Sequence, residues 1–146
     1  MSLLSTRGEE REVVESPGAR IEIYRVGPSI LVTHVQGHAI GQHVRRLIAR
    51  SDDLIARAGR ISVVHNWFEV TGYESEVRSA MTPWALKTRA AHAGIHIGSN
   101  AAIVQMGVTM VRLASGAPIH AYKTLASLEV ALGDALRAHR EKAAGE

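Results

Sequence analysis

The spacing of apolar residues changes repeatedly along the chain, and each change predicts a different backbone structure. Residues 20–26 (RIEIYRV) alternate apolar with polar side chains, which is typical of a strand that buries one face. Residues 30–35 predict a second strand, and the Gly27-Pro28 pair before them predicts a turn. We therefore expect a β-hairpin at the start of the domain.

Beyond residue 39, helical and extended patterns alternate. Apolar residues at the three- or four-residue spacing of an amphipathic helix predict four helices, over residues 40–58, 77–88, 101–114 and 125–136. Short apolar runs predict three more strands, over residues 61–65, 94–98 and 118–122. A helix then separates each pair of consecutive strands. We predict an α/β fold: a single mixed, mainly parallel sheet of about five strands, with an N-terminal β-hairpin and four crossover or terminal helices.

One predicted helix and the two chain ends differ from this regular pattern. Residues 101–114 are apolar almost all round, so we expect this helix to be well buried. Residues 1–18 are polar and end in Ser16-Pro17-Gly18, which predicts a flexible N-terminal arm. Residues 141–146 are expected to be a C-terminal tail, which leaves one domain over residues 19–140.

The composition limits the cellular compartments and the classes of partner that we expect for this protein. The chain has no cysteine, which excludes disulfides, thiolate zinc sites and iron–sulfur clusters. It has no apolar run near the roughly 20 residues of a membrane span, so we expect a cytoplasmic protein without a transmembrane segment. The formal net charge is +3, and the arginine surplus lies between residues 38 and 60. That segment has no interleaved aromatic residues, so we interpret it as a solvated helix face and predict no nucleic-acid partner.

Eight histidines are the main candidates for chemistry. Four of them fall in predicted strands: His34, His65, His96 and His120. Alternation places His96 and His120 on one face of the sheet and His34 and His65 on the other, toward the helices. Two imidazoles on a face are fewer than the three protein ligands of a catalytic zinc, so we predict neither a metal site nor a cofactor. Without a nucleophile elbow, a P-loop or a dinucleotide-binding motif, the chain is not expected to be an enzyme.

The segment ISVVHNWFEVTGYESEVRSA, residues 61–80, carries a resemblance to a known family. It reads as a strand, a loop of about eight residues, and a tyrosine-acid-serine step into a helix, which is the layout of a STAS domain. Together with Met106-Gly107-Val108 and the residues from Leu125 to Leu132, it resembles the SpoIIAA-like branch, the anti-sigma-factor antagonist fold. The resemblance covers roughly residues 19–137. It implies a non-enzymatic regulatory or scaffolding module that binds a protein partner or forms a homo-oligomer.

The resemblance also implies a phospho-acceptor. In phospho-switch members an Asp-Ser-(Ser/Thr)-Gly step opens the second helix, and its serine takes the phosphate. Glu74 falls at the acid and Ser75 at the serine, whereas Glu76 and Val77 depart from the pattern. The alternative is that Ser75, or Thr71 with Glu74, only caps the helix.

Two binding regions follow, each with a structural alternative. The segment from Asn66 to Ser75 is expected to contact a partner through five residues: Trp67, Phe68, Tyr73, Glu74 and Ser75. Its aromatic residues would equally fit a loop pinned to the core. The likeness to lipid-binding Sec14-type domains implies an alternative function, the binding of a lipid or another apolar molecule in a pocket near Trp84, Met106 and Met110. Methionines on a buried helix also fit ordinary core packing.

Overall fold

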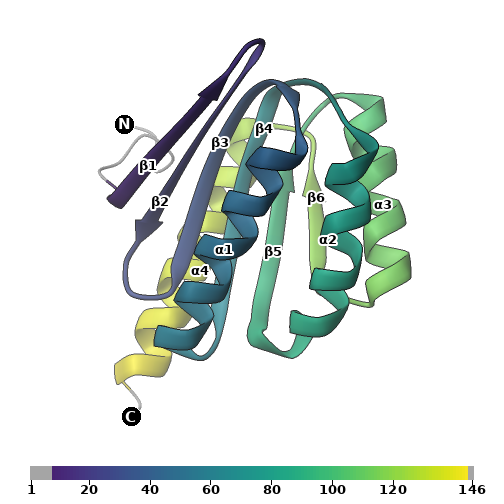
Figure 1. Ribbon diagram of the computed structural model, residues 1–146. Helices are drawn as coiled ribbons and strands as arrows, with labels where there is room; N and C mark the ends of the chain where they lie inside the picture. Colours follow the sequence, from purple (N-terminus) through teal and green to yellow (C-terminus); the bar gives the residue numbers. More distant parts are fainter. Residues whose placement is uncertain (1–7, 145–146) are drawn as a thin grey trace.

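The computed structural model describes residues 8–144 and places one mixed sheet between two layers of helices (Figure 1). None of the helices in this range is long and apolar enough to cross a membrane. In chain order the elements are β1 (Glu9–Ser16), β2 (Ala19–Val26), β3 (Ile30–Ala39), α1 (Gly41–Ala58), β4 (Ile61–Tyr73), α2 (Ser75–Thr88), the 3-10 helix η2 (Arg89–Ala91), β5 (His92–Gly98), α3 (Ala102–Ser115), β6 (Ile119–Tyr122) and α4 (Leu125–Ala144).

The six strands lie side by side in the order of the sequence, from β1 to β6. The first three are antiparallel, and β3 to β6 are parallel. The predicted α/β class and N-terminal hairpin are therefore confirmed, with six strands in place of about five.

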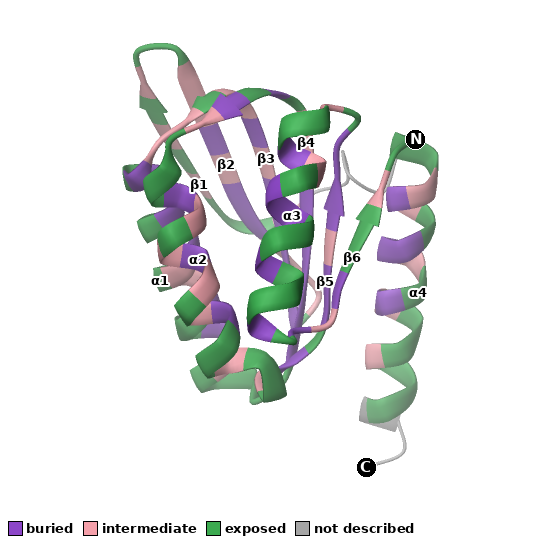
Figure 2. Cartoon of the chain, turned by 90° about the vertical axis from the view of Figure 1, so that its right-hand side faces the viewer, coloured by how far each residue is buried: buried purple, intermediate pink, exposed green. Residues whose placement is uncertain are grey.

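The helices divide between the two faces of the sheet. Helices α1, α2 and α3 cover one face and α4 covers the other (Figures 1 and 2). Because successive side chains of a strand point to opposite faces, Leu31 and Val63 pack under α1–α3, whereas Val32 and Val64 pack under α4. Leu128 and Leu132 anchor α4 and are completely buried.

The expectation of a flexible arm over residues 1–18 is wrong for residues 9–16, which form the edge strand β1. Residues 1–7 lie outside the described range. The expected tail over residues 141–146 is also wrong in part, because α4 continues to Ala144. The polar character of residues 9–16 has a different cause, which is that their glutamates bind arginines of α1 and of the neighbouring strand β2.

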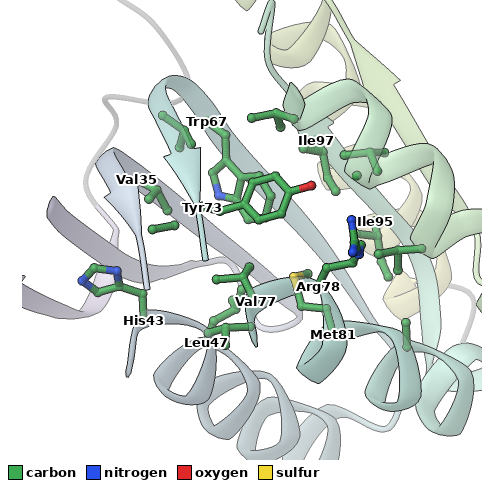
Figure 3. Close-up of a pocket in the computed structure, with 18 of the residues that line it drawn as sticks. Val35, His43, Leu47, Trp67, Tyr73, Val77, Arg78, Met81, Ile95 and Ile97 are labelled. Carbon is green, nitrogen blue, oxygen red and sulfur yellow. The ribbon is translucent and has the colours of Figure 1, made fainter. Parts of the chain in front are cut away.

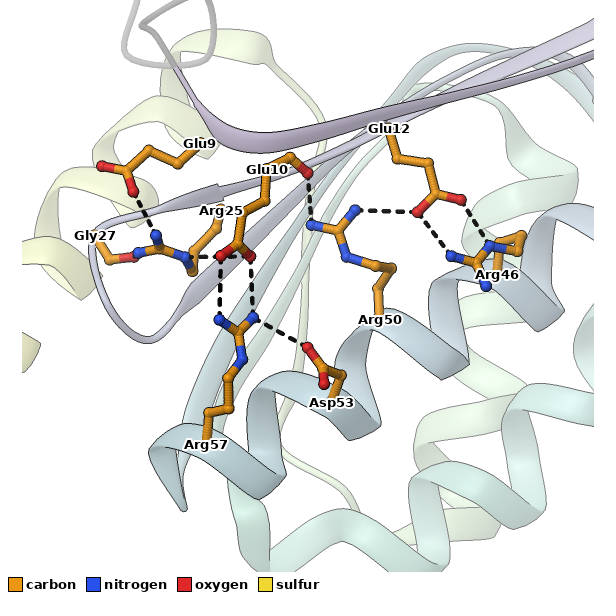
Figure 4. A network of polar contacts seen from close by, with 9 residues as sticks. All are labelled: Glu9, Glu10, Glu12, Arg25, Gly27, Arg46, Arg50, Asp53 and Arg57. Carbon is orange, nitrogen blue, oxygen red and sulfur yellow. Dashed lines mark hydrogen bonds and ion pairs between the residues drawn. The ribbon is translucent and has the colours of Figure 1, made fainter.

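Ion pairs join β1 to α1 (Figure 4). Glu12 accepts two bonds from the Arg46 guanidinium, at 2.7 and 2.8 Å, and one from Arg50 at 3.1 Å. Glu10 binds Arg57 through two bonds of 3.0 and 3.1 Å. Hydrogen bonding to Arg46 lowers the pKa of the Glu12 carboxyl below its usual 4.5. The arginine surplus of α1 is thus largely neutralised within the chain.

A polar pair is buried beneath α1–α3. The Thr33 hydroxyl and His65 Nδ1 lie 2.7 Å apart, and the two residues are 0% and 2% exposed. Burial lowers the pKa of His65 to about 3, because the charged imidazole would lose its hydration. The side chain is therefore neutral in the folded protein at any physiological pH.

We predict that Glu12→Gln weakens the attachment of β1 to α1. The substitution should lower the free energy of unfolding by about 1 kcal/mol at pH 7, because it removes a bidentate, partly exposed ion pair. The lowered pKa means that the stabilisation is complete above pH 4.5 and is lost as the pH falls below it. Urea denaturation of both proteins at pH 7 and pH 3.5 measures this. Glu15→Gln is the control, since the Glu15 side chain is 70% exposed and its bond to Arg20, at 3.1 Å, should contribute little. Equal stability of E12Q and E15Q at pH 7 would contradict the prediction.

The free energy of unfolding should begin to fall at a pH well above the range in which the carboxylates take up protons. In the unfolded chain His65 takes up a proton below a pKa of about 6.5, whereas the folded protein resists it down to about 3. The free energy of unfolding should therefore fall by about 1.4 kcal/mol per pH unit for this histidine as the pH drops below 6.5. Urea denaturation between pH 7 and pH 5 measures the slope. His65→Gln should reduce it and the control His34→Gln should not; identical slopes for H65Q and the wild type would refute this account.

Candidate functional site

A cavity of about 60 Å³ lies between the sheet and helices α1, α2 and α3 (Figure 3). The side chains of β2–β6 form its floor and those of the three helices form its walls. Most of them are aliphatic, such as Val35, Leu47, Val77, Ile95 and Ile97. This cavity belongs to the larger of the two cores, so the packing that folds the domain also shapes the site.

The segment Asn66–Ser75, which we expected to be a partner-binding loop, is mostly strand. Strand β4 continues to Tyr73 and stays paired with β3, as the Ala39–Tyr73 pair shows. Trp67 and Tyr73 turn toward the cavity, whereas Phe68 packs with Leu128 under α4. The loop was implied by the resemblance of residues 61–80 to a STAS domain, whereas here the strand continues through Val70, which is buried. The aromatic residues are therefore divided between two cores.

Arg78 brings a positive charge to the wall of the cavity. The side chain is half-buried, and its Nη1 lies 3.6 Å from the Met110 sulfur. No carboxylate among residues 8–144 forms an ion pair with it, in contrast to Arg46, Arg50 and Arg57. Arg78 could not be recognised from the sequence, because nothing in the local sequence shows which helix face meets a cavity.

Two uncharged polar groups also reach the cavity. Trp67 Nε1 is buried and has no hydrogen-bond partner within the described part of the chain. A buried N–H without an acceptor is unfavourable, so this group can donate a hydrogen bond to an acceptor atom of a molecule that enters the cavity. The Tyr73 hydroxyl donates to the Ile103 carbonyl over a long 3.5 Å.

Gly107 allows Tyr73 to approach α3 closely. A Cβ atom at position 107 would lie 2.4 Å from the Tyr73 hydroxyl oxygen, which is closer than atoms can approach. The glycine of the Met106-Gly107-Val108 step therefore accommodates an aromatic side chain that lines the cavity.

The residues predicted for an apolar pocket separate in the structure. Trp84 lines the cavity, and its Nε1 donates to Asp52 over 2.8 Å. Met106 and Met110 do not line it; their exposed fractions are 60% and 44%. The expectation that residues 101–114 are well buried is likewise wrong, because α3 buries only one of its two apolar faces. Val104, Val108 and Val111 occupy the buried face.

Ser75 is the first residue of α2 and is exposed. Neither Ser75 nor Thr71 caps the helix: the N-cap residue is Glu74, and no side chain makes a capping bond. The Glu74 carboxylate accepts the Gly41 amide at 3.0 Å, and Glu76 forms an ion pair with Arg45. Both acidic neighbours of Ser75 are thus engaged elsewhere.

The strand histidines follow the predicted alternation with one exception. His96 and His120 stack with ring centroids 5.4 Å apart on the α4 side, and His96 Nδ1 lies 2.8 Å from the Tyr122 hydroxyl. Burial lowers the pKa of His96 to about 4. His65 faces α1–α3 as expected, but His34 lies on the opposite face and pairs with Glu69. The expectation failed for His34 because Ile30 and Val32, with which it is in phase, pack in the α4 core. Across residues 8–144 no group of three or more potential ligands is placed to hold a metal ion.

Comparison with known proteins bears on the fold. No protein-family model matches the chain, and the search of curated proteins found no similar sequence. The structure resembles an uncharacterized protein from the DUF3478 family, with a SpoIIAA-like fold, from Shewanella loihica PV-4. The TM-score is 0.54 and the identity 14%, and the match covers 82% of this chain and 92% of the other. The chain therefore has the SpoIIAA-like, STAS-like fold that residues 61–80 and the Met-Gly helix predicted.

Proposed function

We propose that this protein is a non-enzymatic binding module that holds a small amphiphile, with an apolar body and an anionic group, in the cavity beneath α1–α3. The observation that carries the proposal is the half-buried Arg78 side chain, which has no carboxylate partner in residues 8–144 and borders an apolar cavity. A guanidinium in such a place binds a carboxylate or phosphate group strongly, because the surrounding protein screens the charges less than water does.

The rest of the site fits the two ends of such a molecule. The aliphatic lining would hold its apolar body, as in most small-molecule sites. The orphan N–H of Trp67 would donate a hydrogen bond to an oxygen of the bound molecule, which removes the cost of leaving that group unpaired. Arg78 would hold the anionic group.

The cavity must widen to admit such a ligand. Its 60 Å³ is smaller than the roughly 150 Å³ of an apolar cavity that binds benzene. Long, unbranched side chains stand where widening is needed, namely Arg78 and Met81. Both can change rotamer without moving the backbone, and methionine adapts readily to irregular apolar shapes.

The polar groups of the lining support binding rather than catalysis. The described residues around the cavity include three titratable side chains, His43, Tyr73 and Arg78. Both ring nitrogens of His43 have partners: Nδ1 accepts the Ile40 amide at 3.1 Å, and Nε2 lies 3.2 Å from the Ser16 hydroxyl. Ser16 does not line the cavity, and the lining contains no serine, cysteine or carboxylate, so no nucleophile stands where a bound molecule would lie.

Decanoate and decan-1-ol are matched probes of the proposed site. We expect decanoate to bind at least about tenfold more tightly, because its carboxylate makes a charge-assisted bond to Arg78 that the alcohol cannot make. Arg78→Gln should abolish the difference, and Arg112→Gln, at an exposed position of α3, should preserve it. Isothermal titration calorimetry below the micelle concentration measures both affinities. If the wild type binds no decanoate and native mass spectrometry detects no co-purifying amphiphile, the cavity is not a ligand site.

A second candidate function is a regulatory module that recognises a protein partner at the start of α2. The observation that favours it is the exposure of Ser75 in the first turn of the helix, where a phosphate would gain from the helix dipole. Because Glu74 bonds to the Gly41 amide and Glu76 to Arg45, the repulsion between these carboxylates and a phosphate would be reduced.

The phosphorylation of Ser75 can be tested by the intact mass of the protein isolated from its native cell. We expect a fraction with one added phosphate, about 80 Da, that is absent from Ser75→Ala. Ser79→Ala, at an exposed position one turn later in α2, is the control and should keep the added mass. A mass without phosphate under all growth conditions would remove this candidate.

A further inference from the structure

The outer face of α3 carries an exposed apolar stripe. Its members are spaced three and four residues apart, so they line up along one side of the helix: Ile103, Met106, Met110 and Leu113. Their exposed fractions run from 44% for Met110 to 79% for Leu113. The opposite side of α3 is the buried one, so the stripe points away from the sheet, and Figure 2 shows that side of α3 open to the viewer. A contiguous exposed apolar surface of this kind indicates an interaction site.

The stretch of sequence that contains this stripe carries charge of one sign. Between Val77 and Leu128 the chain contains no acidic residue but five basic ones, which are Arg78, Lys87, Arg89, Arg112 and Lys123. The first four belong to α2, η2 and α3. Helices α2 and α3 are neighbours, and the Arg89 guanidinium lies close to Gly116 at the end of α3. Lys87, Arg89 and Arg112 are exposed and form no ion pair with any residue in the range 8–144.

We infer that the outer face of α2 and α3 docks on an anionic lipid surface. Apolar side chains that enter the boundary between headgroups and acyl chains, flanked by basic residues that meet acidic headgroups, are the features of an interfacial helix. The geometry fits, because α3 has two apolar faces. One packs against the sheet, and the other is exposed and can contact the bilayer.

The charge on this face favours an anionic bilayer over a second copy of the chain as the binding partner. Two copies that met through their α3 stripes would bring two sets of basic residues together, and the sequence from Val77 to Leu128 supplies no acidic residue to pair with them. Such an arrangement is repulsive. An anionic bilayer supplies the complementary charge and an apolar phase at the same time.

The docking face is continuous with the cavity through one contact. Arg78 lines the cavity, and Met110 belongs to the stripe. The Arg78 Nη1 atom lies 3.6 Å from the Met110 sulfur. The inference does not rest on the proposed function, however, because the stripe and its flanking charges would bind a bilayer whether or not the cavity holds a ligand. A loss of vesicle binding and a loss of decanoate binding are separate results.

Vesicle flotation of the full chain tests the inference. We expect binding to vesicles of two parts phosphatidylcholine to one part phosphatidylglycerol, and little binding to pure phosphatidylcholine. Met106→Glu and Leu113→Glu should each lower the partition coefficient at least about tenfold, because each places a carboxylate in the apolar contact. Lys87→Gln and Arg89→Gln should lower it about fivefold each, and added salt should weaken binding of the wild type.

Val130→Glu is the matched control, because Val130 is 63% exposed but lies on α4, across the sheet. This variant should bind vesicles like the wild type, and circular dichroism should show that all variants are folded. The inference is overturned if the wild type does not bind anionic vesicles, if it binds neutral vesicles equally well, or if V130E loses as much affinity as M106E. Sedimentation that shows a dimer dissociated by M106E, without vesicle binding, would instead assign the stripe to self-association.

Discussion

The parallel pairing of β3 with β4 determines where the aromatic residues of β4 and the start of α2 lie. The pairing runs from Ile30 opposite Ser62 to Ala39 opposite Tyr73, the last residue of β4. Because β4 stays in the sheet for 13 residues, its alternation directs Trp67 beneath α1–α3 and Phe68 beneath α4. The strand ends directly before α2, so the same pairing also fixes the start of that helix and the position of Arg78. A shorter strand would have left the aromatic residues in a surface loop.

The parts of the fold that depend on local pattern could be predicted from the sequence. The alternation in RIEIYRV and the helical spacing of the later segments are properties of neighbouring residues, and they were sufficient for the α/β class, the hairpin and the order of the elements. Strand β1 was missed because its charged residues hide the strand pattern, and some of their ionic partners are far away in the sequence. Glu12 is bound by Arg46 and Arg50, more than thirty residues later, and a strand held in this way looks like a polar tail.

The candidate site was less predictable for a related reason. Trp67, Tyr73 and Trp84 were recognised as notable residues, but their grouping into one cavity depends on how α2 packs over β4. Helix α3 shows the limit most clearly. An apolar helix usually has neighbours on all sides, so we expected burial. This helix covers one edge of the sheet and has a neighbouring helix, α2, beside it, so half of its apolar surface remains exposed. The sequence shows that two faces are apolar but not which one meets the core.

The distribution of ion pairs divides the molecule into two electrostatically different sides. On α1 the arginines at positions 46, 50 and 57 have glutamates from β1 as partners, and the ionic groups there are satisfied within the chain. On α2, η2 and α3 the basic residues have no acidic neighbour in the sequence between Val77 and Leu128. The Arg78 side chain is half-buried, and no carboxylate among residues 8–144 forms an ion pair with it. The side formed by α2, η2 and α3 therefore has basic residues without a negatively charged partner in the described part of the chain. It also has an apolar stripe on α3 that nothing in this part covers. A single anionic amphiphile in the cavity would supply negative charge to Arg78 only. An anionic bilayer against α3 would supply negative charge to the other basic residues and would also cover the apolar stripe.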